Sequence, residues 1–365
     1  MKKLILLLFA PLLVTACLDD DSHEMNDTFV GNFEACWQTM DEHYCFFQQK
    51  GIDWDSVHDV YLPLFRDSVV DIVEEFGLMG EMLSELRDGH VNLYSPFNTA
   101  RYWKWYEDYE LNFDENLLYR YYLGQNYWIA SGMHYTMFRD SVAYLRYASF
   151  SSAVGEANLD YVLAALRNAK GLIIDVRDNG GGSLTNVPAI ASRFATKKVI
   201  YGYMQHKVGR GHNDFSELQP LSLEPDRQRY HWDASQQPVV VLTNRHCFSA
   251  CNSFVAAMRA LDGIPVPDSA GVMHPLIIKT MGDRTGGGGG MPFESVLPNG
   301  WTLRFSACPI TDHLKRHIEE GIDPDMTVMM DSLRAFELHA DDIIDSARTY
   351  IILNTLKEYP DKKTE

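Results

Sequence analysis

From Ser141 onward the sequence alternates short apolar runs with amphipathic stretches, and this alternation limits the possible fold more than any other feature. The predicted order is strand 143–147, helix 158–168, strand 171–176, helix 187–194, strand 239–242 and helix 249–261. The run Gly-Leu-Ile-Ile-Asp-Val at 171–176 is typical of a strand that is buried on both faces. Strands that alternate with helices form βαβ crossovers around a largely buried sheet. We therefore predict an α/β core over residues 141–352.

The region before this core has the periodicity of amphipathic helices. Apolar residues recur at spacings of three and four, first at Phe29, Phe33, Trp37 and Met40, and again between residues 69 and 86. This pattern predicts a small N-terminal helical unit over residues 28–93.

Residues 94–140 differ from both neighbours because they are rich in Tyr and Trp. The stretch 119–123, Tyr-Arg-Tyr-Tyr-Leu, has the composition of a β-strand. We predict a linking β-rich region here and recognise no PDZ-type peptide-binding insert. Residues 353–365 are interpreted as a C-terminal tail.

The first residues have the layout of a secretory signal peptide. Lys2 and Lys3 precede an apolar run over residues 4–14, which is too short to cross a bilayer. Residues 14–17, Val-Thr-Ala-Cys, resemble the lipobox of bacterial lipoproteins, which implies cleavage after residue 16 and acylation of Cys17. The polar, acidic residues that follow, up to 27, are interpreted as a flexible tether. The alternative is an ordinary cleaved signal with an incidental cysteine.

Charge and cysteine content restrict the partners. The formal charge of −18 becomes about −20 once residues 1–16 are removed, which argues against nucleic-acid or anionic-membrane partners. We expect a protein of the bacterial cell envelope, anchored to the membrane through its N-terminal lipid. Five cysteines remain besides Cys17, so at least one thiol is free. No Cys or His spacing is that of a zinc site, and we predict neither a metal nor a cofactor.

Three short segments have the residues for catalysis. Ser249 lies between an apolar strand and a helix, where free N–H groups and the helix dipole favour a developing oxyanion. This segment alone favours an N-cap, and only the other two segments favour a catalytic role. A glycine-rich turn, Arg-Asp-Asn-Gly-Gly-Gly at 177–182, follows the strand 171–176. His90 follows Asp88 and Gly89 where a helical pattern changes to a strand pattern.

Together these segments resemble the tail-specific, or C-terminal-processing, serine peptidases and the core of tricorn protease. The resemblance covers residues 29–93 and 141–350 and is most specific at 171–182. It implies a protease core of the ClpP/crotonase-like type in which Ser249 attacks the peptide carbonyl. The implied oxyanion hole consists of the N–H group of Ala250 and that of Gly180 or Gly181.

One departure from the tail-specific pattern affects the choice of general base. The family's catalytic Lys position is occupied by Gly288, and Lys279 lies among strand-like residues outside the motif. Tricorn-like members use a His from the N-terminal region, so the favoured base is His90, with a pH limb near the ordinary histidine pKa of about 6.5. A carboxylate usually orients such a His. We favour Glu320 over the adjacent Glu319, although both could simply face solvent.

The expected substrate is a peptide or protein, cleaved by a serine peptidase. Two other hypotheses remain open from the sequence. The vacant Lys position is compatible with a catalytically silent peptide-binding lipoprotein. The many aromatic residues of 101–128 are compatible with a glycan-binding lipoprotein, but they suit internal packing equally well.

Overall fold

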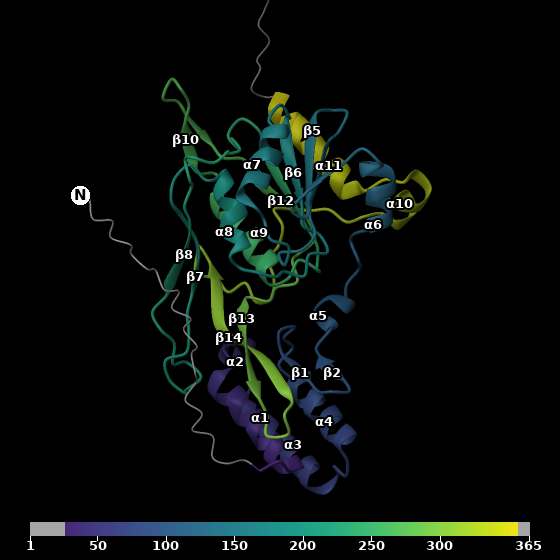
Figure 1. The fold of residues 1–365 in the computed structure, drawn as a ribbon, viewed down its shortest axis with the longest axis vertical. Helices are drawn as coiled ribbons and strands as arrows, with labels where there is room; N and C mark the ends of the chain where they lie inside the picture. Colours follow the sequence, from purple (N-terminus) through teal and green to yellow (C-terminus); the bar gives the residue numbers. More distant parts are fainter. Residues whose placement is uncertain (1–25, 357–365) are drawn as a thin grey trace, which may run out of the picture.

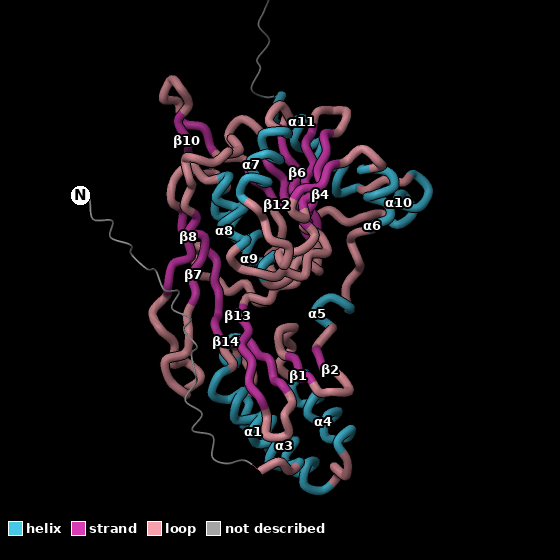
Figure 2. Tube along the Cα trace, viewed as in Figure 1, coloured by secondary structure: helices cyan, strands magenta, loops and turns pink. Residues whose placement is uncertain are grey.

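The computed structural model describes residues 26–356 and shows two lobes, one above the other (Figure 1). The upper lobe contains a seven-stranded sheet with helices on both faces. The lower lobe contains the N-terminal helices, packed against a second sheet (Figure 2). The predicted signal peptide, Cys17 and most of the acidic tether lie outside the described residues. Within 26–356, no helix is long and apolar enough to cross a membrane.

The seven-stranded sheet has the order β15-β12-β9-β6-β5-β4-β3. Its first five strands are parallel, and β4 and β3 extend one edge as an antiparallel hairpin. In chain order the strands are β3 (Trp128–Ala130), β4 (Met133–Met137), β5 (Val142–Tyr147), β6 (Gly171–Asp175), β9 (Val239–Thr243), β12 (Ile278–Gly282) and β15 (Met326–Thr327). The predicted α/β core with a mixed sheet is confirmed, and its predicted strands agree within a residue or two.

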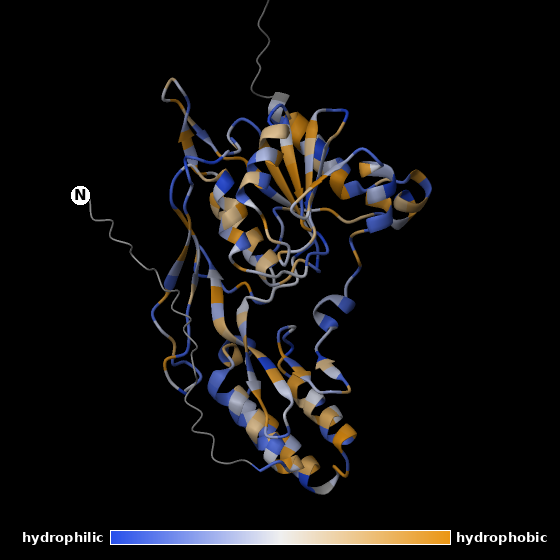
Figure 3. Ribbon diagram, viewed as in Figure 1, coloured by the Kyte–Doolittle hydropathy of each residue, from blue (hydrophilic) through white to orange (hydrophobic). Residues whose placement is uncertain are grey.

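Helices cover both faces of this sheet because the side chains of its strands alternate between two apolar layers. Leu172 and Ile174 of β6 face one cluster, whereas Ile173 faces the other. The first layer contains α7 (Glu156–Ala165), α8 (Asn186–Ala191), η2 (Ser192–Phe194) and α9 (Ala250–Leu261). The second contains η1 (Leu118–Leu123) and α11 (Asp342–Leu356). The central strands are accordingly mostly hydrophobic (Figure 3).

The lower lobe combines the beginning of the chain with a much later segment. Its helices are α1 (Phe29–His43), α2 (Phe47–Lys50), α3 (Trp54–Asp67) and α4 (Ile72–Ser84). The second sheet has the order β2-β1-β14-β7-β8, with β13 also paired to β14. Its strands are β1 (Asn92–Tyr94), β2 (Thr99–Arg101), β7 (Val199–Met204), β8 (Gln219–Leu223), β13 (Gly290–Val296) and β14 (Thr302–Asp312).

The β13–β14 hairpin completes the apolar core of the lower lobe. Leu303 and Phe305 of β14 are fully buried against helix residues such as Phe33 and Met40. The hairpin belongs to the part of the chain predicted as protease core, but it extends down among the N-terminal helices (Figure 1). Residues 28–93 therefore do not form their core alone.

The linking region is less β-rich than predicted. It contains β2, β3 and β4, but also α5 (Lys104–Glu107), α6 (Glu115–Leu117) and η1. The stretch 119–123, predicted as a strand, is part of the π-helix η1, so that prediction is wrong. The physical reason is its burial pattern, because Leu118 and Leu123 insert into the layer beneath the large sheet, and Tyr119 and Tyr122 pack against that layer. The remaining elements are β10 (Pro265–Pro267), β11 (Met273–Pro275) and α10 (Ser332–Leu338).

Candidate active site

Ser249 occupies a sharp turn between β9 and α9. Its backbone has φ 58° and ψ −122°, a conformation that a residue with a Cβ rarely adopts. Ser249 stands at the N-cap position of α9, but its side chain makes no capping hydrogen bond. Its Oγ lies instead 3.0 Å from Nε2 of His90. The strained turn thus directs the hydroxyl away from its own helix and toward the imidazole.

His90 reaches Ser249 from the lower lobe, 159 residues earlier in the chain. It follows the turn after α4 and precedes β1, and its side chain is only 3% exposed. The ring packs on Phe248, with the ring centroids 4.6 Å apart. Burial lowers the pKa of His90 to about 4, against the raising effect of the Asp88 carboxylate. The imidazole is therefore neutral near pH 7 and can accept a proton from the hydroxyl.

The structure does not bring Glu320 to His90, which corrects the expectation for the orienting carboxylate. Glu320 is exposed, and its backbone carbonyl accepts a hydrogen bond from Nε of Arg284. Among the described residues, His90 Nδ1 has no hydrogen-bond partner. The carboxylate that acts on the imidazole is that of Asp88, and it acts through its charge, which raises the pKa of His90. Asp88 is held in place because it accepts the backbone N–H of His90 at 2.7 Å and the Ser306 hydroxyl at 2.8 Å.

Glu319 is buried where Glu320 is exposed, and it pairs with Lys50. Nζ of Lys50 lies 2.9 Å from Glu319 Oε1 and also donates to the carbonyls of Leu86 and Arg87, just ahead of His90. Burial and the nearby Asp88 raise the pKa of Glu319 to about 8, with Lys50 opposing them. The sequence analysis missed Lys50, since nothing in its local pattern indicates a partner 269 residues away.

Backbone N–H groups near Ser249 are suitably placed for an oxyanion hole. Among the described residues, neither Gly180 nor Ala250 donates its N–H to a protein acceptor, whereas Gly181 donates to Oδ1 of Asn179 at 3.0 Å. A Cβ on Gly181 would lie 2.9 Å from the Ala250 nitrogen and 2.8 Å from the Ser249 Cβ. Only glycine fits this approach, and of the two predicted glycines Gly180 keeps its donor free.

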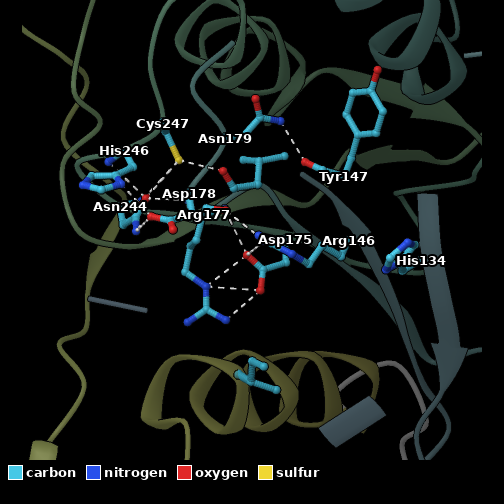
Figure 4. A network of polar contacts seen from close by, with 12 residues as sticks. His134, Arg146, Tyr147, Asp175, Arg177, Asp178, Asn179, Asn244, His246 and Cys247 are labelled. Atoms are coloured by element: carbon cyan, nitrogen blue, oxygen red, sulfur yellow. Dashed lines mark hydrogen bonds and ion pairs between the residues drawn. The ribbon is translucent and has the colours of Figure 1, made fainter. Parts of the chain in front are cut away.

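A buried network of charged side chains fixes the start of the glycine-rich loop, residues 177–182 (Figure 4). Arg177 is fully buried, contacts both carboxylate oxygens of Asp175, and lies 2.9 Å from Asp341 ahead of α11. Arg146 donates to the Arg177 carbonyl at 2.8 Å. Because these groups join β5, β6 and α11, they fix the start of the loop that contains Gly180.

The other candidate bases are engaged elsewhere. Lys279 pairs with Asp262, which follows the last residue of α9. A side chain at Gly288 would place its Cβ 2.5 Å from the Phe248 ring, so the family's Lys could not stand there without a shift. His246 pairs through Nδ1 with Asp178 at 2.8 Å (Figure 4).

Ser249 and His90 open onto a cavity of about 530 Å³ between the two lobes. Gly180, Gly181 and Gly182 line one wall, and the start of the second sheet lines the other. Trp105 of α5 stacks on Phe248 at 4.3 Å between ring centroids and closes one side. The arrangement has the size and the groups to hold an extended peptide against the hydroxyl.

Comparisons with known proteins identify the family. The model of peptidase family S41 matches residues 141–267, and that of the tricorn protease C1 domain matches residues 25–83. A crystal structure from Parabacteroides merdae, of a protein described as a candidate peptidase, is 46% identical. It covers 92% of this chain and 100% of its own, with a TM-score of 0.82. A comparison with curated proteins gave no match.

Two solved structures of low identity have the same fold. Mature CPAF in complex with lactacystin is 11% identical, covers 91% of this chain and 99% of its own, and has a TM-score of 0.67. The photosystem II D1 C-terminal processing protease is 14% identical, covers 82% and 93%, and has a TM-score of 0.51. The resemblance to these peptidases is confirmed: the chain belongs to peptidase family S41 and is a serine-type peptidase.

Proposed function

We propose that this peptidase cleaves peptide bonds through an acyl-enzyme on Ser249, with His90 as general base. The observation that supports the proposal best is the 3.0 Å contact between Ser249 Oγ and His90 Nε2, made across 159 residues of chain. Ser249 Oγ attacks the scissile carbonyl carbon while His90 Nε2 takes its proton. His90 then protonates the leaving amine. In the second half, water attacks the ester while His90 takes its proton, and His90 returns that proton to Ser249 Oγ as the acid product leaves.

The remaining groups stabilise the charges of this reaction. The N–H groups of Gly180 and Ala250 would receive the oxyanion, because neither is donated to an acceptor among the described residues, Ala250 directly follows Ser249, and Gly180 lines the same cavity. The imidazolium that forms on His90 is stabilised by the nearby carboxylate of Asp88, a role that the sequence analysis assigned to Glu320. Lys50 and Glu319 position the segment that contains both Asp88 and His90.

A fluorophosphonate probe tests the nucleophile directly. We expect the protein to become covalently labelled, and mass spectrometry of its peptides to place the label on Ser249, because only this hydroxyl contacts an imidazole in the cavity. Ser149 and Ser151 line the same cavity and serve as internal controls. Labelling of either control serine, or none at all, would count against the assignment.

The burial of His90 predicts an unusually acidic pH limb. A general base must be neutral to act, so kcat/KM is lost as the pH falls through the pKa of His90 in the free enzyme. With that pKa at about 4, we expect the rise of kcat/KM well below the ordinary histidine range. The measurement is a pH profile with a peptide that does not titrate there, with circular dichroism at each pH. A limb near 6.5 in folded protein would show that the imidazole is solvated.

We further propose that the peptidase is a lipid-anchored protein of the bacterial cell envelope, acting on proteins or peptides there. The support is the sequence of residues 1–17 alone. Replacing Cys17 by alanine is expected to move the protein from the membrane fraction to the soluble fraction of cells, because the acyl chains are lost. Unchanged membrane partition of Cys17→Ala would contradict the anchor.

A further inference from the structure

Two arginines and an asparagine form a row across the second sheet, next to His90. In the strand register, Arg304 of β14 lies opposite Asn92 of β1, and Asn92 lies opposite Arg101 of β2. Directly paired residues of antiparallel strands project from the same face of a sheet. Arg304, Asn92 and Arg101, here called the arginine row, all line the cavity that contains Ser249.

This cavity is positively charged although the chain as a whole is acidic. Its lining includes both arginines of the row, but no Asp or Glu. The whole chain has 50 acidic residues against 32 Lys and Arg, so its net charge is negative. The cavity wall has the opposite sign, because its charged residues are arginines. Such a wall attracts an anionic group toward the reacting atoms.

The guanidinium groups of the row have no acidic partner within the described residues. Glu294 of β13 lies opposite Arg304 in the register, but the two form no ion pair, and Glu294 does not line the cavity. By contrast, Arg245 and Arg284 of the neighbouring hollow are paired with Asp283 and Asp323. The charges that face Ser249 are thus available to a ligand, whereas those around them are used within the protein.

The surroundings of Arg101 favour recognition of a planar anion. Its guanidinium lies over the rings of Tyr94 and Trp103, at 5.7 Å and 5.2 Å from their centroids. Stacking on aromatic rings restrains the plane of the guanidinium and leaves its edge for hydrogen bonds. That edge matches the two oxygens of a carboxylate.

We propose that the arginine row binds an acidic side chain, Asp or Glu, of the peptide substrate close to the scissile bond. The inference rests on the proposed function, because it makes the row a specificity site of the Ser249 cavity. A carboxylate held by Arg304 or Arg101 would lie on the His90 side of the cavity. Substrates without an acidic residue there would leave two arginines without a partner, which costs affinity.

The test is a set of matched peptides, blocked at both ends, in which Glu or Gln is placed in turn at each position around the cleavage site. We expect Glu to raise kcat/KM over Gln by about tenfold to a hundredfold at one position. The double variant Arg101→Gln with Arg304→Gln should bring this ratio close to one. Arg227→Gln, an exposed arginine outside the cavity, should leave the ratio unchanged.

A second pair of variants separates recognition from a packing role. Arg101→Glu with Arg304→Glu should reverse the preference, so that Lys is favoured over Glu at the same position. Binding of the Glu peptide to Ser249→Ala, followed by fluorescence anisotropy, should weaken when the row is changed as well. A loss of packing would lower the rate for all peptides and reverse nothing.

Two outcomes with the blocked peptides would overturn the inference: equal rates for Glu and Gln at every position, or a Glu preference that survives both arginine substitutions. A third would come from the same peptides with an unblocked C-terminus, if the preference for an acidic group appeared only with that free carboxylate. The last would mean that the row binds the chain end and not a side chain. Failure of the proposed function itself looks different, because no peptide would be cleaved and no fluorophosphonate would label Ser249.

Discussion

Replacing Ser249 by alanine is expected to lower kcat/KM for peptide hydrolysis by about 10⁴-fold or more, and replacing His90 by alanine to lower it by a similar factor. The hydroxyl of Ser249 is a weak nucleophile until a base accepts its proton, and the base in contact with it is His90. Because the two groups act as one unit, the double variant should be no slower than the slower single variant. Steady-state kinetics on one peptide, with circular dichroism for folding, provide the measurement.

Lys279→Ala is the matched control for this prediction. Lys279 pairs with Asp262 and is one-third exposed, so its loss should leave turnover within a few-fold of normal. A loss as large as that of Ser249→Ala would instead favour a Ser/Lys dyad. Near-normal turnover of a folded His90→Ala variant would move the search for a base to His246, which already pairs with Asp178.

Replacing Arg177 by methionine is expected to lower the free energy of unfolding by about 3–5 kcal/mol. The side chain has no exposed surface, and its removal leaves the carboxylates of Asp175 and Asp341 buried without their main cation. Arg146, at 3.7 Å from Asp175, compensates only in part. Urea denaturation should show a lower midpoint with an unchanged slope.

Arg316→Met provides the comparison, because Arg316 also pairs with an aspartate, Asp312, but is 65% exposed. An exposed pair contributes about 1 kcal/mol or less, so this variant should unfold nearly like the wild type. Adding Asp175→Asn and Asp341→Asn to Arg177→Met should restore part of the lost stability, since the unpaired charges are then removed. Equal midpoints for Arg177→Met and Arg316→Met would show that the buried network adds nothing.

The sequence contains the information for the large sheet because its strands are short, apolar and locally distinct. Local sequence is enough to predict β6, β9 and the junction before α9, because none of them depends on a distant partner. The contact of Ser249 with His90 was expected only through the family resemblance, since no local pattern joins residues 159 positions apart. The geometry then added what the motifs lacked, namely the strained turn of Ser249 and the free N–H of Gly180.

The errors share a physical origin, which is tertiary packing over long sequence distances. Local composition favoured a strand at 119–123, but burial beneath the large sheet selected a π-helix. Glu319 and Glu320 look alike in sequence, and only the position of Lys50 makes one of them a buried partner. The arginine row likewise depends on the register of β14, β1 and β2, three strands whose order differs from that of the chain.

Because of the β13–β14 hairpin, the rate of peptide hydrolysis depends on the relative position of the two lobes. Ser249 directly precedes Ala250 of the upper core, and His90 directly precedes Val91 of the lower core. The hairpin completes the lower core, and its strand β14 also pairs with β7. A relative shift of about 1 Å between reacting groups can cost a hundredfold in rate. We therefore expect heating or mild denaturant to abolish activity by shifting the two lobes relative to each other, under conditions in which both cores are still folded.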